Sequence, residues 1–432
     1  MPVLHERILS RRARVAVIGL GYVGLPLAVA LGEAGFTVAG YDLDPDKVAG
    51  LRQGRSHIAD IPASAVAALL AESRFHPSDD PDILHGVEIA IICVPTPLSL
   101  GKQPDLGFVL AAAQHVAAYL QRGTLVVLES TTYPGTTEDV LRPVLERGGL
   151  KVGKDFFLAF SPERVDPGNA KFNLKNTPRV VGGCDPESAR LAALLYEQVA
   201  PCVHVVSSAR VAEMAKLLEN TFRHVNIALA NEMAVLCRAM GIDIWEVVEA
   251  AATKPYGFMA FYPGPGVGGH CIPIDPHYFS WKVREYDRHA RFIELAAEIN
   301  DRMPRRVADL VTDALNDRRK AVRGAQVLVL GVAYKKDVAD ARESPALKVM
   351  ELLLKKGAEV RYHDPHLPSV VCNGATLHSV PLTREELERS DCVLVLTDHS
   401  ALDYGMVAAC STLVVDTRNA LKGIKSDRIV RL

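Results

Sequence analysis

Short apolar runs alternate with amphipathic helical patterns along the first half of the chain. Runs of this kind, apolar on successive positions, are typical of strands buried on both faces of a parallel sheet. Strands that alternate with helices predict a doubly wound α/β domain. The expected strands are residues 15–18, 38–41, 88–94 and 125–128, followed by strands near 156–160, 179–181 and 203–206.

A long segment without Pro or Gly follows this domain, from Arg210 to Met240. Its content of Ala, Leu, Glu and Asn predicts a helix, and Gly241 suits the left-handed residue that ends many helices. About 30 residues at 1.5 Å each make a rod of about 45 Å, long enough to connect two domains. A second set of strands is expected at residues 326–330, 359–362, 392–396 and 413–415.

The two ends of the chain resemble each other in layout. Val-Ala-Val-Ile-Gly before a helix, with Tyr41-Asp42 after the next strand, corresponds to Val-Leu-Val-Leu-Gly before a helix, with Tyr362-His363-Asp364 after the next strand. The sequence therefore predicts an α/β fold with two Rossmann-like doubly wound domains joined by a long central helix. The expected boundaries are 1–205, 206–305 and 306–432.

Composition narrows the class of protein. With 432 residues, 49 Lys plus Arg and 51 Asp plus Glu, the chain is long enough for two or three domains and nearly neutral. We therefore expect neither nucleic acid nor a membrane surface as the main partner. The polar N-terminus and the short apolar run after it predict a cytoplasmic protein. The eight cysteines form no CxxC pair and no metal-ligand spacing, so no disulfide framework and no metal are expected.

The segment Gly19-Leu20-Gly21-Tyr22-Val23-Gly24 follows an expected strand and opens an expected helix. In that context its glycines allow a tight turn, and a pyrophosphate can lie on the helix N-terminus. Asp42 ends the next strand, where a carboxylate can bind both ribose hydroxyls and repel a 2′-phosphate. The pattern predicts an NAD site rather than an NADP site, and the alternative is a turn of glycines without a ligand.

A loop rich in Gly and Pro, residues 263–275, holds Cys271. Taken alone, Cys271 is as well explained as a small packing residue as it is as a nucleophile. The long helix adds Lys216 and Asn220, which lie four residues apart and hence on one face. A cation and an amide on one face can converge on a single oxygen, although such a pair is usually only a solvated helix surface.

Several motifs in one order resemble the UDP-glucose/GDP-mannose dehydrogenase family along essentially the whole chain. In addition to the glycine turn they are Val94-Pro95-Thr96-Pro97, Glu-Ser-Thr-Thr-Tyr-Pro-Gly-Thr-Thr at 129–137, Ser-Pro-Glu-Arg-Val-Asp-Pro-Gly at 161–168, Lys216 with Asn220, Gly268-Gly269-His270-Cys271 with Asp275, and Tyr-Lys-Lys-Asp at 334–337 followed by Asp-Ala-Arg-Glu-Ser-Pro at 340–345.

The resemblance implies a four-electron oxidation of a sugar C6 alcohol to a carboxylate with two NAD molecules in turn. It implies that Cys271 forms a thiohemiacetal and then a thioester. Lys216, Asn220 and a water held by Asp275 would stabilise charge on oxygen, and Glu163 and Thr131 would direct the final hydrolysis.

The resemblance also assigns binding residues. For the cofactor they are Gly19, Gly21, Tyr22, Val23, Gly24, Asp42, Lys47, Pro95, Thr96, Thr131 and Arg342. For the sugar nucleotide they are Glu163, Arg164, Val165, Lys216, Asn220, Tyr262, Gly268, Lys335 and Arg418. The three segments then become an NAD-binding domain, a central helical domain with the Cys271 loop, and a UDP-sugar-binding domain. A homodimer is expected.

The sequences of residues 129–137 and 161–169 resemble the branch that acts on UDP-N-acetylglucosamine more than the branches that act on UDP-N-acetylmannosamine or UDP-glucose. Glucose-type members carry an arginine upstream of the cysteine loop, where this chain has Lys254-Pro255-Tyr256-Gly257-Phe258. The remaining alternatives are a single-step hydroxyacid dehydrogenase, which would need no cysteine, and a nucleotide-sugar binder without activity.

Overall fold

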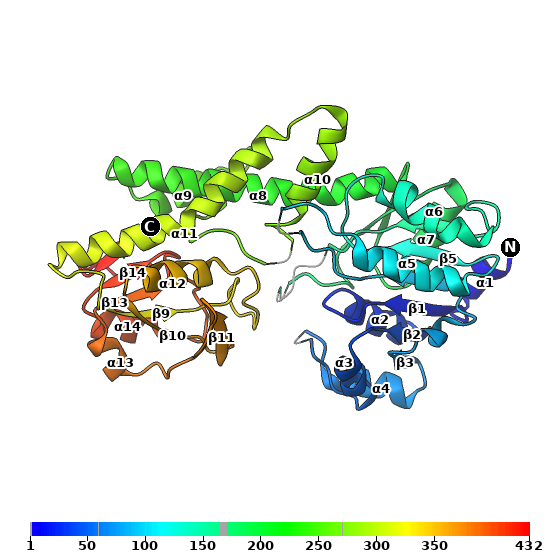
Figure 1. Ribbon diagram of the computed structural model, residues 1–432, viewed down its shortest axis with the longest axis horizontal. Coiled ribbons are helices and arrows are strands. Elements are labelled where there is room, and N and C mark those ends of the chain that lie inside the picture. Colours follow the sequence, from blue (N-terminus) through cyan, green and yellow to red (C-terminus); the bar gives the residue numbers. More distant parts are fainter. Residues whose placement is uncertain (1, 59, 100, 165–168, 170, 270) are drawn as a thin grey trace. The chain divides into compact units, whose positions relative to one another are not determined.

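A computed structural model describes residues 2–58, 60–99, 101–164, 169, 171–269 and 271–432. The chain forms two compact units. The first contains Met1–Glu219 and His277–Arg288, and the second contains Asn220–Pro276 and His289–Leu432. Each unit is built around its own sheet, so the α/β fold with two doubly wound sheets is confirmed (Figure 1).

The first unit contains an eight-stranded sheet in the order β3-β2-β1-β4-β5-β6-β7-β8. Its strands are β1 (Arg14–Ile18), β2 (Thr37–Tyr41), β3 (Phe75–Ser78), β4 (Ile89–Ile92), β5 (Leu125–Leu128), β6 (Phe157–Phe160), β7 (Arg179–Gly183) and β8 (Val203–Val206). Its helices are α1 (Pro2–Leu9), α2 (Gly24–Glu33), α3 (Pro45–Arg52), α4 (Ala63–Ala71), α5 (Gly107–Tyr119), α6 (Arg142–Leu145) and α7 (Pro186–Tyr196), with short helical turns at Pro81–Leu84, Thr136–Leu141 and Glu146–Gly148.

One feature of this sheet differs from the expected parallel sheet. Strand β7 runs antiparallel to β6, while the other neighbouring pairs are parallel. A parallel neighbour requires a crossover connection, usually a helix, and no helix lies between β6 and β7 in the part of that connection that the structure describes. The chain therefore returns along the edge of β6 in the opposite direction.

Alternate residues of the strands divide between two cores, as the pleat requires. In β1, Val15 and Val17 pack with α2 and α7 on one face, whereas Ala16 and Ile18 pack with α5 and α6 on the other face. The carboxyl ends of β1, β2, β4, β5 and β6 lie along one edge of the sheet, because these strands are parallel. The loops that follow these strands carry most of the predicted site residues of the unit, while Lys47 is on α3 and Lys216 is on α8.

Helix α8 (Ala209–Ala239) begins in the first unit and continues into the second. The predicted helix differs from it by one residue at each end, and Gly241 has the left-handed conformation expected of a helix end, with φ +70°. Helix α10 (Asp275–Val283) begins in the second unit, and the turn at Arg284–Tyr286 follows it in the first.

The second unit contains a five-stranded parallel sheet in the order β10-β9-β13-β14-β15 and a small hairpin, β11-β12. The strands are β9 (Gln326–Leu330), β10 (Glu359–His363), β11 (Ser369–Cys372), β12 (Ala375–His378), β13 (Cys392–Val395), β14 (Val414–Asp416) and β15 (Ile429–Arg431). Its helices are the later part of α8, α9 (Ile244–Ala252), α11 (Arg291–Asp317), α12 (Pro345–Lys355), α13 (Arg384–Arg389) and α14 (Tyr404–Cys410). Across the described residues, no helix is both long and apolar enough to cross a membrane.

Candidate active site

The glycine turn between β1 and α2 gives its three glycines different roles. Gly19 has φ +90°, and its amide donates to Tyr41 O at 2.7 Å. A Cβ on Gly24 would lie 1.8 Å from Gly19 O, so a side chain there cannot fit. A Cβ on Gly21 would meet nothing within 4 Å. Gly19 and Gly24 therefore close the turn, and Gly21 faces open space into which a pyrophosphate can approach.

Asp42 is fixed at the end of β2 by the same turn. Its Oδ2 accepts the Leu20 amide at 2.7 Å, and Lys47 Nζ lies 2.9 Å from both carboxylate oxygens. Lys47, which was predicted to bind the cofactor, thus contacts Asp42 directly. Carboxylate oxygens have several lone pairs, so these contacts leave Asp42 able to accept a ribose hydroxyl. Pro95 and Thr96 follow β4 at the same edge of the sheet.

The loops after β5 and β6 carry Thr131 and Glu163. The Glu163 side chain is mostly buried, at 13% exposed, and its backbone oxygen accepts a bond from Lys216 Nζ at 2.5 Å. Arg164 pairs with Glu219 at 2.7 Å. Lys216 and Glu219 are both on α8, so this helix contacts the loop after β6 directly. Val165, a predicted substrate residue, lies outside the described residues.

Arg179, at the start of β7, was not among the predicted site residues. Its guanidinium lies 3.2 Å from Glu129 and 3.4 Å from Glu163, and it is 2% exposed. Burial disfavours its charge, but the two carboxylates outweigh burial and raise the pKa of Arg179. Burial raises the pKa of Glu129, which also accepts the Tyr196 hydroxyl at 2.5 Å. Arg179 could have been noticed in the sequence as the single charged residue at the start of an otherwise apolar strand.

Glu213 on α8 is a second residue that the sequence reasoning missed. Its carboxylate accepts the amides of Gly135 and Thr137 at 2.6 and 2.8 Å, and the Thr137 hydroxyl at 2.7 Å. Burial raises the pKa of Glu213 to about 7, even though these bonds favour the charged form. Glu213 thereby holds the turn formed by the end of the Thr-Thr-Tyr-Pro-Gly-Thr-Thr motif.

In the second unit, Asn220 donates a hydrogen bond from its amide nitrogen to Asp275 Oδ2, and both residues are buried. Asp275 begins α10, and its amide donates to Cys271 O at 2.8 Å. Cys271 is exposed. An exposed thiol therefore lies one helical turn before a buried carboxylate that is bonded to the predicted helix amide.

The cysteine loop packs closely on residues near the C-terminal sheet. A Cβ on Gly269, whose φ is +89°, would lie 2.8 Å from the Tyr334 ring, and one on Gly268 would lie 2.8 Å from Glu343 O. Tyr334 is next to Lys335, a predicted substrate residue. His270 lies outside the described residues. The glycines of the loop are thus needed for its close approach to the segment that carries Lys335.

The start of the same loop approaches Arg418. A Cβ on Gly264 would lie 2.4 Å from Arg418 Nη1, and the Gly264 amide donates to Asn231 Oδ1 at 2.9 Å. Arg418 Nε donates to Leu396 O at 2.9 Å. The structure therefore brings the predicted residues Gly268, Cys271, Asp275, Lys335 and Arg418 together with Asn220 in one compact unit.

Two further predicted residues, Arg342 and Tyr262, contact neighbours that were not predicted site residues. Arg342 forms a forked pair with Asp340, with bonds of 3.0 Å from Nε and 2.7 Å from Nη2. Tyr262 is 51% exposed and stacks on Trp245, with ring centroids 6.1 Å apart. Tyr262 thus packs on α9 through Trp245, and half of its surface stays exposed.

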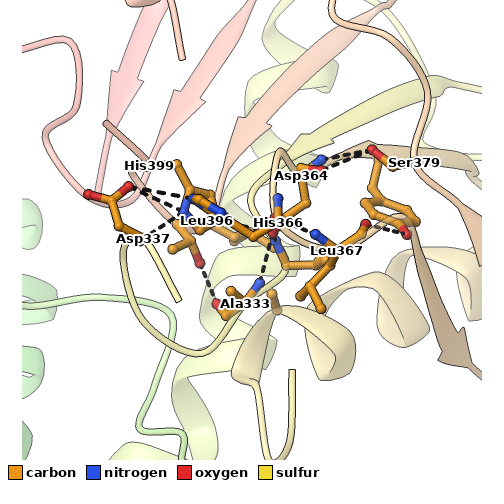
Figure 2. Close-up of polar contacts among 12 residues, drawn as sticks. Ala333, Asp337, Asp364, His366, Leu367, Ser379, Leu396 and His399 are labelled. Atoms are coloured by element: carbon orange, nitrogen blue, oxygen red, sulfur yellow. Dashed lines mark hydrogen bonds and ion pairs between the residues drawn. The ribbon is translucent and has the colours of Figure 1, made fainter. Parts of the chain in front are cut away.

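Among the described residues, one group has the spacing of a metal site. The candidate ligand atoms of Asp337, His366 and His399 lie within 4.8 Å of one another (Figure 2). His399 Nδ1 accepts the Asp337 amide at 2.9 Å, so its Nε2 carries the proton and donates to Asp364 at 3.1 Å. Because both ring nitrogens of His399 are already hydrogen-bonded, we interpret the group as a structural link between the segment at Asp337 and the end of β10.

Comparison with known proteins gives matches along nearly the whole chain. Three models of the UDP-glucose/GDP-mannose dehydrogenase family match in order: the NAD-binding domain at residues 13–200, the central domain at 210–302 and the UDP-binding domain at 328–423. A UDP-N-acetyl-D-mannosamine dehydrogenase from Pyrococcus horikoshii is 36% identical over 419 residues, 95% of this chain and 96% of the relative. A UDP-N-acetyl-D-glucosamine 6-dehydrogenase from Pseudomonas aeruginosa is 39% identical over 354 residues, 82% of each.

A solved structure of a UDP-D-ManNAc dehydrogenase from Pyrococcus horikoshii superposes with a TM-score of 0.89 at 35% identity, covering 97% of this chain and 98% of the other. The matched NAD-binding domain contains the Gly19–Gly24 turn and Asp42, and the matched UDP-binding domain contains Lys335, Arg342 and Arg418. On these matches and on the geometry of its two units, the chain belongs to the UDP-glucose/GDP-mannose dehydrogenase family and is an NAD-dependent UDP-sugar dehydrogenase.

Proposed function

We propose that the protein oxidises the C6 alcohol of UDP-N-acetylglucosamine to the uronic acid through a covalent intermediate on Cys271. The observation that carries the proposal is the group in the second unit, in which the exposed Cys271 lies one turn before Asp275 and Asp275 is bonded to Asn220. Cys93 and Cys392 are buried, and burial raises their pKa values, so these thiols are poor nucleophiles. Cys271 is the cysteine that lies in a glycine loop beside a buried acid.

The proposal assigns a residue to each step of the reaction. The C6 alcohol first loses a proton and a hydride to give an aldehyde, and Asp275 holds the water that takes part in the proton transfer. The Cys271 thiolate then adds to the aldehyde carbon, and the oxygen gains a proton as the thiohemiacetal forms. Lys216 and Asn220 stabilise the negative charge on that oxygen.

The thiohemiacetal next loses a proton and a hydride to give the thioester. Bound NAD supplies the hydride acceptor for each oxidation. Water directed by Glu163 and ordered by Thr131 then adds to the thioester carbon, and the C–S bond breaks to release the carboxylate and regenerate Cys271. One alcohol and one water thus give one carboxylate, two NADH and three protons. Because the aldehyde is captured on sulfur, none need escape.

The binding residues follow from the same proposal. The cofactor would be held by the glycine turn with Tyr22 and Val23, by Asp42 with Lys47, and by Pro95, Thr96, Thr131 and Arg342. The sugar nucleotide would be held by Glu163, Arg164, Val165, Lys216, Asn220, Tyr262, Gly268, Lys335 and Arg418. Guanidinium forks suit phosphate oxygens, so Arg342 is proposed for the cofactor pyrophosphate and Arg418 for the UDP moiety.

The identity of the sugar is the finer part of the proposal. Two observations favour UDP-N-acetylglucosamine. They are the sequences of residues 129–137 and 161–169, and the relative that is 39% identical over 82% of the chain. The relative and the solved structure that match nearly the whole chain favour UDP-N-acetylmannosamine as the second candidate. Both candidates carry an acetamido group, and Lys254 to Phe258 replaces the arginine segment of glucose-type members.

A panel of UDP-sugars at equal concentration, followed by NADH absorbance, tests the assignment. We expect kcat/KM to be highest for UDP-N-acetylglucosamine, by about tenfold or more over UDP-glucose, since that ratio corresponds to about 1.4 kcal/mol of transition-state binding. A higher value for UDP-N-acetylmannosamine would transfer the assignment to the second candidate. A higher value for UDP-glucose would contradict the acetamido proposal.

We further propose that the protein is a homodimer that forms through α8. Leu218, Phe222, Leu229, Met233 and Leu236 are exposed on this helix. At 100° per residue they fall within an arc of roughly 60°, so they form one apolar stripe that fits a second copy of itself. Leu229→Glu should reduce the mass measured by light scattering from that of a dimer to that of a monomer. A monomeric wild-type protein would contradict the proposal.

A further inference from the structure

Four side chains form a buried charged cluster beneath the loops that follow β5 and β6. Glu129 follows β5, Glu163 follows β6, Arg179 opens β7 and Tyr196 ends α7. Because β5, β6 and β7 are neighbours in the sheet, the three charged residues meet at one end of it. The Glu129 and Arg179 side chains are both buried, and the Glu163 side chain is 13% exposed. Glu163 is thus the outermost of the three charged groups.

The guanidinium of Arg179 makes a different contact with each side of the cluster. Its Nη1 lies 3.2 Å from Glu129 Oε2 and 3.4 Å from Pro162 O, and its Nη2 lies 3.4 Å from Glu163 Oε2. The Tyr196 ring lies 4.9 Å from the guanidinium carbon, and the Tyr196 hydroxyl binds Glu129. The contacts of Nη1 and of the Tyr196 ring fix the guanidinium, so Nη2 meets Glu163 from a fixed direction.

We propose that Arg179 is a positioning residue for the hydrolysis of the thioester, holding the Glu163 carboxylate from behind in the orientation that directs water. This inference rests on the proposed function, which gives Glu163 its role. Lys216 Nζ fixes the backbone of Glu163, whereas Arg179 contacts its side chain. The two cations therefore constrain different parts of one residue.

A purely structural role for Arg179 is the competing explanation. Removing one partner of a buried ion pair leaves an uncompensated charge and destabilises the fold. Such a role concerns the Glu129 side of the cluster alone and leaves thioester hydrolysis unchanged. The positioning role depends on the planar fork, which presents separate nitrogens to Glu129 and Glu163. A lysine at this position keeps the charge but has a single nitrogen, which cannot hold both carboxylates in the same way.

Arg179→Lys therefore separates the two explanations. The full-length variant is mixed with a UDP-N-acetylhexosamine and NAD, quenched at intervals and analysed by intact-protein mass spectrometry for a hydroxylamine-sensitive adduct. We expect a burst of two NADH per site, an adduct that accumulates, and hydrolysis slower by about tenfold or more, which corresponds to about 1.4 kcal/mol. Because the loss of hydride does not involve Arg179, kcat should fall at saturating UDP-sugar while the burst rate stays unchanged.

Three further variants make the result specific. Arg190→Lys alters an exposed Arg–Glu pair on α7 and should behave as wild type. Tyr196→Phe removes the bond to Glu129 only, so it should lower Tm without slowing hydrolysis. Glu163→Gln should accumulate the adduct at least as strongly as Arg179→Lys.

The outcomes distinguish this inference from the function on which it rests. If Glu163→Gln accumulates the adduct and Arg179→Lys hydrolyses it at the wild-type rate, the positioning role is wrong and the covalent mechanism stands. If Tyr196→Phe slows hydrolysis as much as Arg179→Lys, the effect follows from the stability of the cluster and the positioning role is also wrong. If no variant accumulates an adduct and one NADH forms per sugar, both the mechanism and the inference are overturned.

Discussion

Gly21 and Gly24 belong to one turn of six residues, and we expect alanine to act on them in opposite ways. A methyl group at Gly24 would lie 1.8 Å from Gly19 O, well inside contact distance, and the obstacle is backbone that cannot rotate away. The turn must open, so Gly24→Ala should lose about 3 kcal/mol of stability, at the upper end for overpacking. For a domain of this size that corresponds to a fall in Tm of roughly 6 °C or more.

A methyl group at Gly21 meets nothing within 4 Å, and Gly21 is not among the glycines with positive φ. Gly21→Ala should therefore leave Tm unchanged or raise it slightly, because alanine has less freedom in the unfolded chain. The methyl group would occupy the space that the pyrophosphate approaches, so we expect the Kd for NAD to rise by at least about tenfold, or about 1.4 kcal/mol.

Thermal unfolding and calorimetric titration with NAD measure both effects. Gly148→Ala is the matched control, because Gly148 is in the same unit, has no positive φ and also has open space at its Cβ position. It should change neither Tm nor the Kd for NAD. The reasoning is refuted if Gly21→Ala binds NAD with wild-type affinity, or if it loses as much stability as Gly24→Ala.

Three further predictions follow from single residues. Asp42 should make kcat/KM higher for NAD than for NADP by about tenfold or more, because a 2′-phosphate would lie against its carboxylate, and a preference for NADP would contradict this role. Because the pKa of Glu213 is raised from 4.5 to about 7, Glu213 stays protonated in the native state at pH values where it is already ionised in the unfolded chain. The free energy of unfolding should therefore fall by about 3 kcal/mol as the pH rises from 4.5 through 7. Urea unfolding of Glu213→Gln at several pH values should show a weaker dependence on pH than the wild type. Cys271→Ser should keep its Tm and its affinity for both ligands but lose turnover by about a thousandfold, roughly 4 kcal/mol, and near-normal activity would exclude the covalent mechanism.

The sequence predicted the elements whose patterns are local. Buried strands such as β1 and β9 read as short apolar runs, and α8 read as a long segment without Pro or Gly that ends before Gly241. Strand β3, with the sequence Phe-His-Pro-Ser, was missed because it lies at the edge of its sheet, where polar residues and proline are tolerated. The division into three segments at 205 and 305 stays a prediction.

The site residues that belong to a recognisable sequence motif could be predicted. Those whose role comes from a contact with a residue far away in the sequence could not. Gly19, Cys271 and Asp275 stand in recognisable segments. Arg179 and Glu213 make their contacts with residues 16 to 78 positions away, and neither stands in a motif. The reversed direction of β7 was missed for a related reason, since residues on their own do not reveal strand direction.

The number of NADH molecules formed from each sugar tests the central claim most directly. The wild-type enzyme is given a limiting, calibrated amount of UDP-N-acetylglucosamine with excess NAD, and the reaction is followed to completion with no reagent that traps aldehydes. A four-electron oxidation through the Cys271 thioester predicts two NADH for each sugar and a carboxylate as the product. One NADH for each sugar, with an aldehyde or ketone as the product, would contradict the account and indicate a single-step dehydrogenase.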